Sequence, residues 1–219
     1  LVDSLSGIAQ ATNNILKLEG HPVHPIQNYQ QFVGYGIDEL LSRALPVDFR
    51  HKKYIDRVLK KLTAEYSRTW RQYGKLYPGI GEMLSHFNDQ DIPLAILSNK
   101  PHNFTIQFAE YYLSHWHFEE IAGASPHSPC KPAPDMAVKI AHKLGIACNH
   151  IFFVGDSNVD ILTARAAGMI AIGVSWGFRS ITELRSAGAR HIIDTPGDLI
   201  SIVNKQTKNT GERYRAGDF

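Results

Sequence analysis

The residues best suited to chemistry lie where a buried strand is expected to end. Residues 151–154 are continuously apolar, as in a parallel strand covered on both faces, and Gly155 and Asp156 follow them. Asp160 comes one helical turn later, so both carboxylates can face the crevice at the carboxyl end of the sheet. Carboxylate oxygens at that spacing suit Mg²⁺. The alternative is that Asp156 only caps a helix over residues 157–168.

Two further sets of polar residues, upstream of residue 151, also lie next to expected strands or helices. Ser98 and Asn99 end the apolar run 94–97, and Lys131 lies in a proline-rich segment just before another helical pattern. A hydroxyl and an amide can donate hydrogen bonds to phosphoryl oxygens, and an ammonium can neutralise their charge. The alternatives are an ordinary Ser-Asn turn and a solvated lysine in a stiff loop.

These three groups, in this order and each preceded by a strand, resemble motifs two, three and four of the haloacid dehalogenase-like superfamily of aspartate-nucleophile phosphatases. The resemblance is nearest to the phosphoglycolate phosphatase branch and runs from residue 1 to about residue 202. It implies that Asp156 binds Mg²⁺ directly. Asp160 would not contact the metal ion but would orient Lys131 or a metal-bound water. Ser98, Asn99 and Lys131 would then be catalytic, and Lys100 is assigned to substrate binding.

The sequence departs from the family at its start. The family opens with a strand ending Asp-x-Asp-Gly-Thr, followed by a segment that looks like residues 1–4, so neither carboxylate of that motif is present. Asp3 matches the position after the motif. Since those aspartates would be the nucleophile, which forms an aspartyl-phosphate, and the general acid-base, we expect this chain alone to hold phosphate with negligible turnover. We expect the native gene product to carry about ten further residues, roughly a strand and its turn.

The absent strand also matters for the sheet. In the resembled fold it lies between the strands that end at Asn99 and Asp156. Its loss would expose two unpaired edges and leave a gap about 10 Å across. We therefore expect a domain that is destabilised, rearranged or paired with another copy.

The elements that must position these residues alternate between strand and helix from residue 77 onward. Such alternation predicts a doubly wound, mostly parallel, Rossmann-like sheet with right-handed crossovers. The expected strands are 94–98, 121–124, 151–155, 170–174 and 191–193, and the expected helices are 79–88, 103–114, 134–144, 157–167 and 181–187.

Residues 5–76 contain no good strand and instead show three or four amphipathic helical stripes. One stripe ends at Gly20, and Asp48 is expected to cap a long helix. The resemblance implies an inserted helical cap domain hinged near Asp3 and Pro78. The expected organisation is a hydrolase core of residues 1–4 and 78–203, a cap of 5–77, and a frayed polar tail of 204–219.

The cap is expected to set substrate choice. Gly34, Tyr35 and Gly36 precede a helix beginning at Ile37, so backbone N–H groups there could meet a substrate anion. The alternative is a flexible turn between two cap helices.

Composition narrows the class of protein. A net charge of +2 disfavours nucleic acid and acidic membrane surfaces as partners, and 43% hydrophobic with 20% charged residues is typical of a soluble globular protein. Cys130 and Cys148 form no spaced metal set, and the histidines are scattered. We therefore expect a cytoplasmic monomer or homodimer acting on a small phosphorylated metabolite.

The first hypothesis is a Mg²⁺-dependent phosphatase most similar to phosphoglycolate phosphatase. A β-phosphoglucomutase-like phosphotransferase shares the core and cap, and would form a bisphosphate intermediate instead of releasing phosphate. The third hypothesis is a catalytically inactive member that binds a phosphorylated ligand or a partner protein. A nucleotide-binding domain is disfavoured, because neither glycine-rich phosphate fingerprint occurs.

Overall fold

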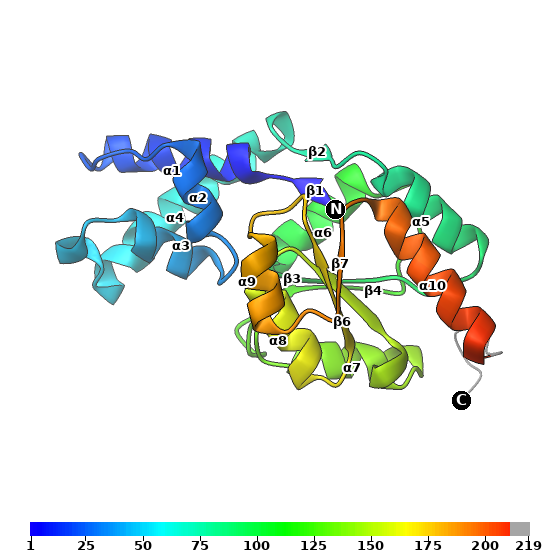
Figure 1. Cartoon of the computed structure of the whole chain (residues 1–219). Coiled ribbons are helices and arrows are strands. Elements are labelled where there is room, and N and C mark those ends of the chain that lie inside the picture. The colour runs from blue at the N-terminus through cyan, green and yellow to red at the C-terminus, as the bar shows by residue number, and fades with distance from the viewer. Residues whose placement is uncertain (211–219) are drawn as a thin grey trace. The chain divides into compact units, whose positions relative to one another are not determined.

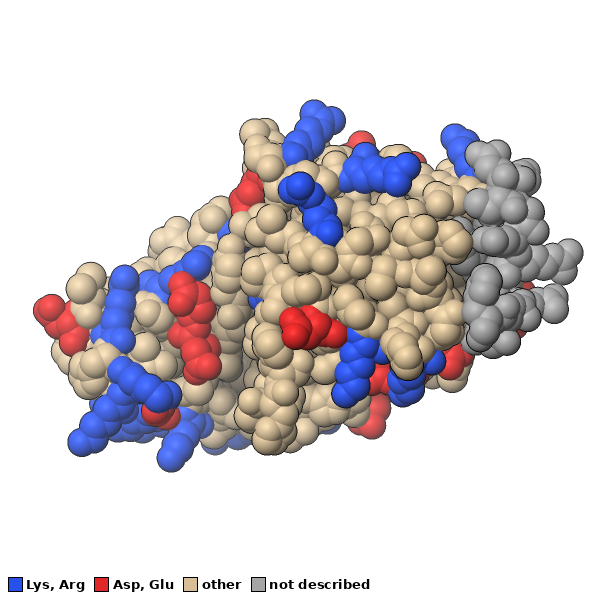
Figure 2. Space-filling view, turned by 90° about the horizontal axis from the view of Figure 1, so that it is seen from below, with Lys and Arg blue, Asp and Glu red and all other residues tan. Residues whose placement is uncertain are grey.

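The computed structural model describes residues 1–210, with side chains through residue 206. The chain divides after Leu76 into two units, and each has its own buried residues. Figure 1 shows the helical first unit and the mixed second unit, and Figure 2 shows acidic and basic side chains interspersed on one face.

Parallel strands form the framework of the second unit (Figure 1). In the described residues they make one sheet of β3 and β4 and another in the order β5-β6-β7. The apolar runs in the sequence therefore do become parallel strands, and the α/β class is as predicted. The strands are β3 Ala95–Pro101, β4 Glu120–Ala124, β5 Phe152–Gly155, β6 Ile170–Val174 and β7 His191–Ile193.

Helices connect and cover these strands. α8 packs on β5, β6 and α9, while α5 and α10 pack on each other. A buried cluster that includes Ile161, Ala164 and Leu184 fills the space beneath α8 and α9. The helices are α5 Ile80–Asp89, α6 His102–Tyr112, α7 Asp135–Leu144, α8 Asn158–Ala166, α9 Ile181–Ala187 and α10 Pro196–Thr210, with a 3₁₀ turn at Cys148–His150.

The two sheets do not pair with each other anywhere in residues 1–210. β6 has a partner on each side and all its residues are buried, whereas β5 pairs only with β6 and β3 only with β4. Val154 in β5 is 39% exposed, which is unusual for a strand of an α/β sheet. β3 and β5 thus each present one unpaired edge.

The first unit is a set of helices closed by a short ribbon. β1 pairs antiparallel with β2, and large side chains such as Leu16, Tyr29 and Trp70 are fully buried. Its elements are β1 Val2–Asp3, α1 Leu5–Leu18, α2 Ile26–Phe32, α3 Ile37–Ala44, α4 Lys52–Thr69 and β2 Lys75–Leu76, with 3₁₀ turns at Val47–Phe49 and Trp70–Gln72.

One expectation for this unit needs correction. Asp48 lies inside the 3₁₀ turn, and the cap of α4 is His51, whose ring accepts from the Tyr54 N–H at 3.3 Å. The first unit, residues 1–76 of the described chain, has four α-helices, within the expected three or four, and α2 is the one whose residues were not predicted. Residues 1–4 were assigned to the core, and in the structure β1 pairs with β2 within the first unit.

The tail also differs from expectation. Residues 204–210 continue α10, because buried Leu199 and Val203 give this helix an apolar stripe and Asp198 accepts two backbone N–H groups at its start. Residues 211–219 of the expected tail lie outside the described residues. In the part of the chain that is described, no helix has the length and apolarity needed to span a bilayer. The assignment of the units as core and cap stays a prediction.

Candidate active site

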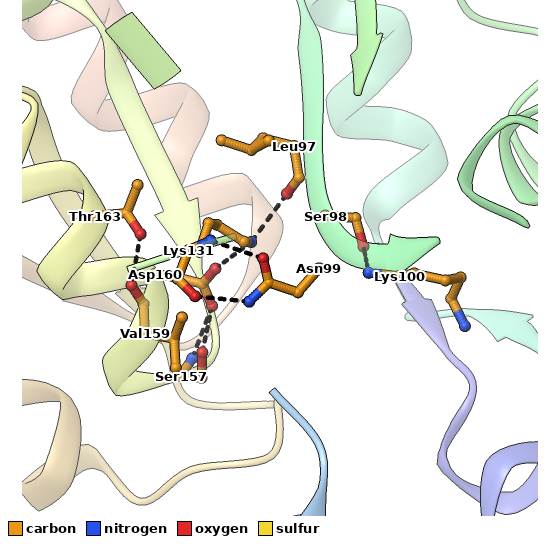
Figure 3. Close-up of polar contacts among 9 residues, drawn as sticks. All are labelled: Leu97, Ser98, Asn99, Lys100, Lys131, Ser157, Val159, Asp160 and Thr163. Atoms are coloured by element: carbon orange, nitrogen blue, oxygen red, sulfur yellow. Dashed lines mark hydrogen bonds and ion pairs between the residues drawn. The ribbon is translucent and has the colours of Figure 1, made fainter. Parts of the chain in front are cut away.

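Lys131 forms a buried ion pair at the centre of the predicted site. It lies in the loop between β4 and α7, and its Nζ donates to Asp160 Oδ1 at 2.6 Å and to the Leu97 carbonyl at 2.9 Å (Figure 3). The side chains of Lys131 and Asp160 are only 11% and 9% exposed. Because Leu97 is in β3 and Asp160 is in α8, this ammonium links the sheet of β3 and β4 to the helix that packs on β5 and β6.

Asn99 fixes the backbone of Lys131. Its Nδ2 donates to the Lys131 carbonyl and its Oδ1 accepts the Lys131 N–H, both at 2.8 Å. Both atoms of the amide therefore hold the lysine loop, whereas the sequence suggested a direct contact with phosphoryl oxygens. Ser98 Oγ accepts the Lys100 N–H at 3.0 Å. Its hydroxyl hydrogen has no acceptor within the described residues, so it can still donate to a ligand.

Asp160 is satisfied on both oxygens. Oδ1 pairs with Lys131, and Oδ2 accepts from the N–H and the hydroxyl of Ser157 at 3.1 and 2.7 Å. Burial opposes ionisation of Asp160, but the Lys131 ammonium and the Ser157 donors outweigh it and lower the pKa of this carboxyl. Gly155 lies so close that a Cβ there would come within 2.6 Å of Oδ2. Asp160 is thus a fixed carboxylate that orients Lys131.

Asp156 is held differently. Its Oδ2 accepts the Phe178 N–H at 3.2 Å, and no further hydrogen bond to the carboxylate occurs in residues 1–210. Burial, and then the charge of Asp160, raise the pKa of Asp156. The N-cap of α8 is Ser157, so the alternative in which Asp156 only caps the helix is wrong.

Mg²⁺ fits this carboxylate. A buried carboxyl with a raised pKa and a free oxygen gains most from a nearby cation. No group of three or more His, Cys, Asp or Glu side chains gathers as a metal site in the described residues. Mg²⁺ commonly uses one or two carboxylates together with water and substrate phosphates, so this sparse donor set suits it better than Zn²⁺ or Ca²⁺.

Lys100 does not join this cluster. Lys100 points away from Lys131 in Figure 3, its Nζ lies 4.3 Å from the centre of the Phe108 ring, and burial lowers the pKa of Lys100 to about 7. Its role in substrate binding stays a prediction.

The glycine-tyrosine-glycine segment lies in the first unit. Gly36 is the N-cap of α3 and has a φ of 98°, and the Arg43 guanidinium lies over the Tyr35 ring at 4.9 Å. Asp38 and Glu39 occupy the first turn of α3, where they disfavour an anion. The part of Gly34, Tyr35 and Gly36 in substrate binding stays a prediction.

Sequence reasoning missed Ser157 and the Phe178 amide. The spacing of Ser157 and Asp160 is a capping-box pattern, so the contact between them could have been predicted. The resemblance also covers Trp176, Gly177 and Phe178, but no chemistry was assigned to them. No local pattern specifies the contact of the Phe178 N–H with Asp156, because the two residues are 22 positions apart.

Comparison with known proteins agrees with this architecture. The sequence model of the haloacid dehalogenase-like hydrolases matches residues 1–174. The phosphoglycolate phosphatase of Aliivibrio fischeri is 29% identical over 183 residues, which cover 81% of each protein. That of Vibrio parahaemolyticus is 24% identical over 208 residues, covering 93% of this chain and 91% of the relative.

Solved structures share the fold. The crystal structure of a Lactobacillus delbrueckii protein matches with a TM-score of 0.86 at 25% identity, covering 92% of this chain and 93% of that one. The family match spans both units and reaches the end of β6, thereby including Lys131, Asp156 and Asp160. The chain belongs to the haloacid dehalogenase-like hydrolase family.

Proposed function

We propose that this protein is a Mg²⁺-dependent phosphatase acting on a small phosphorylated metabolite of the phosphoglycolate type. The observation that carries the proposal is the buried ion pair of Lys131 and Asp160, whose charges act on Asp156. A phosphate monoester is a dianion whose hydrolysis needs charge neutralisation and a positioned nucleophile. An ammonium fixed at the carboxyl end of a parallel sheet supplies the first of these.

Each residue then has a distinct task. Lys131 attracts the phosphoryl oxygens, Asp160 and Asn99 hold Lys131 in place, and Ser98 donates its hydroxyl hydrogen. Asp156 binds Mg²⁺. The metal ion, when bound, would add positive charge beside the phosphoryl group.

The nucleophile in this proposal is a carboxylate delivered by a strand between β3 and β5. In residues 1–210 the Lys131 ammonium contacts a single carboxylate, that of Asp160, which Ser157 also holds. The attacking oxygen bonds to phosphorus as the ester P–O bond breaks, and a second carboxyl protonates the departing alkoxide. Water then hydrolyses the aspartyl-phosphate, releasing phosphate and restoring the carboxylate.

The substrate class rests on relatives named phosphoglycolate phosphatase at 24 to 29% identity. A role for Lys100 and for the segment of Gly34, Tyr35 and Gly36 in holding the organic part of the substrate belongs to the same proposal. We also propose a cytoplasmic monomer or homodimer without nucleic acid or membrane partners, in keeping with the small net charge of +2.

The test compares the chain alone with the chain plus a synthetic strand. Phosphate release from phosphoglycolate is measured in Mg²⁺ with and without an apolar peptide ending Asp-x-Asp-Gly-Thr, and a peptide with the first Asp replaced by Asn is the control. We expect inorganic phosphate to bind the chain alone without turnover, and release to require both Mg²⁺ and the unsubstituted peptide. Substantial release by the chain alone would refute the role given to the added carboxylate.

A second measurement tests the phosphate site itself. Lys131→Met should abolish the calorimetric signal of phosphate binding. Lys143→Met, which removes an exposed lysine paired with Glu120, should leave that signal unchanged. Equal binding by both variants would show that Lys131 is not the phosphate contact.

A catalytically inactive, phosphate-binding protein is the second candidate. It is favoured by one observation, that Asp160 is the single carboxylate contacting the Lys131 ammonium in the described chain. Binding without release, even when the peptide is present, would support it.

A phosphotransferase would instead produce a sugar bisphosphate, which phosphorus NMR detects.

A further inference from the structure

The loop that follows β6 closes around Asp156. The Phe178 N–H donates to Asp156 Oδ2 at 3.2 Å, and the Arg179 N–H donates to the Asp156 carbonyl at 3.2 Å. The Arg179 side chain is buried and its Nε lies 3.5 Å from Glu183 at the start of α9. The loop is therefore anchored on one side to α9 and on the other to both the backbone and the carboxylate of Asp156.

Gly177 is the closest approach in this loop. A Cβ at position 177 would lie 2.0 Å from Asp156 Cβ, 2.5 Å from its Oδ2 and 2.7 Å from its Cγ, closer than real Cβ contacts allow. The backbone of Gly177 does not adopt a positive φ, so any residue could take its conformation. Space beside Asp156, and not backbone geometry, is what requires glycine here.

Both features concern the same side chain. Oδ2 of Asp156 accepts the Phe178 N–H, and a Cβ at position 177 would also meet Oδ2, which leaves Oδ1 as the oxygen free to meet a cation. Removing a group that orients a metal-binding carboxylate without touching the metal typically lowers metal affinity by about 10- to 100-fold.

We propose that Gly177 and the Phe178 amide are positioning groups that aim the Asp156 carboxylate at the bound cation. This proposal rests on the Mg²⁺ site of the proposed function. It extends the site to the loop that follows β6. This loop supplies no charged ligand to the cation.

The test measures Mn²⁺ binding by calorimetry and electron paramagnetic resonance, independently of turnover. Gly177→Ala should weaken Mn²⁺ binding at least ten-fold. Phe178→Ala keeps the backbone N–H and should bind within two-fold of the unsubstituted protein.

Gly173→Ala is the matched control for crowding. Its Cβ would lie 2.7 Å from Ile192 Cδ1 and 3.1 Å from Leu184 Cδ1, so it strains the same unit without touching Asp156. We expect it to lower the unfolding midpoint while Mn²⁺ affinity stays unchanged. If Gly173→Ala and Gly177→Ala lose Mn²⁺ affinity equally, general strain in the unit explains the loss, and the proposal is overturned.

A measurement on the unsubstituted protein avoids any folding defect of the variants. With ¹⁵N-labelled phenylalanine, the Phe178 amide resonance should move on titration with Mg²⁺. If Mg²⁺ binds and this resonance does not move, or if Gly177→Ala binds Mn²⁺ normally, the positioning role is wrong while the metal site stands. If the unsubstituted protein binds neither ion, the metal site of the proposed function fails and this inference fails with it.

Discussion

At the scale of single residues, removing one partner of the buried Lys131–Asp160 pair should cost more folding free energy than the pair itself contributes. Both side chains are about nine-tenths buried, so a lone carboxylate there would lack both water and a counter-ion. Lys131→Met should therefore lower the free energy of unfolding by about 3 kcal/mol, as for one partner removed from a buried pair. Urea unfolding followed by circular dichroism measures it.

An exposed pair provides the control for this prediction. Lys143 pairs with Glu120, and the lysine side chain is 62% exposed, so Lys143→Met should cost less than about 1 kcal/mol. Adding Asp160→Asn to Lys131→Met removes the stranded charge and should recover part of the loss. Equal losses from Lys131→Met and Lys143→Met would mean that the inner pair is solvated.

At the scale of elements, the start of α8 depends on Ser157 in two ways. Ser157 is the N-cap, and its hydroxyl and N–H both donate to buried Asp160. Ser157→Ala removes the hydroxyl donor, and should cost about 2 kcal/mol, the upper end for a cap. Ser180→Ala removes the α9 cap, which accepts from the Glu183 N–H, and should cost about 1 kcal/mol. A smaller loss for Ser157→Ala in thermal unfolding would contradict this ranking.

In the first unit, Glu19 ties the end of α1 to α4. It lies 2.8 Å from Arg57 and 2.5 Å from Lys61, and its side chain is 7% exposed. The hydrogen bond from Lys61 lowers the pKa of Glu19 below its usual 4.5, and burial opposes the shift without reversing it. A depressed pKa in the folded state adds stability above the unfolded value, and that stability is lost as pH falls through the folded value.

Glu19→Gln should thus destabilise the protein near pH 7, and the difference should shrink as pH falls below the usual value of 4.5. Urea unfolding at several pH values measures it, and Glu39→Gln is the control. Glu39 pairs with Arg43 within α3, and its side chain is 46% exposed. A Glu19→Gln effect that grew on acidification would show that the pair does not favour the ionised glutamate.

The same scale shows what the sequence could predict. The strands of the second unit lie within three residues of the expected bounds, and β6 and β7 match them, because continuous apolar runs mark buried parallel strands clearly. The short strands β1 and β2 have no such run and were not expected. α2 was missed because one residue of its seven, Tyr29, is buried, so it has no apolar stripe. The residues of the site were found by type and order, but the task of Asn99 was not. Its partner lies 32 residues away, and no local pattern specifies a contact across that separation.

At the scale of the whole molecule, the unpaired edges of β3 and β5 should control local stability. β6 is paired on both sides, so its amides should exchange with solvent only on global unfolding. Amides of β3 and β5 that point away from β4 and β6 should exchange by smaller openings, giving alternation along each strand. Native-state hydrogen exchange resolved by residue tests this. Uniform protection across β3, β5 and β6 would contradict the presence of open edges.

A strand added between the sheets should change both edges at once. An apolar peptide that pairs with β3 and β5 would satisfy their free N–H and C=O groups and cover Val154, which is 39% exposed. We expect exchange to slow in β3 and β5 together and the unfolding midpoint to rise with peptide concentration, while exchange in the helices of the first unit stays the same. The control peptide carries prolines at alternate positions, which removes the donors to one edge. Protection of one strand without the other would mean that the peptide binds a single edge, and the nucleophile could not then reach Lys131 by this route.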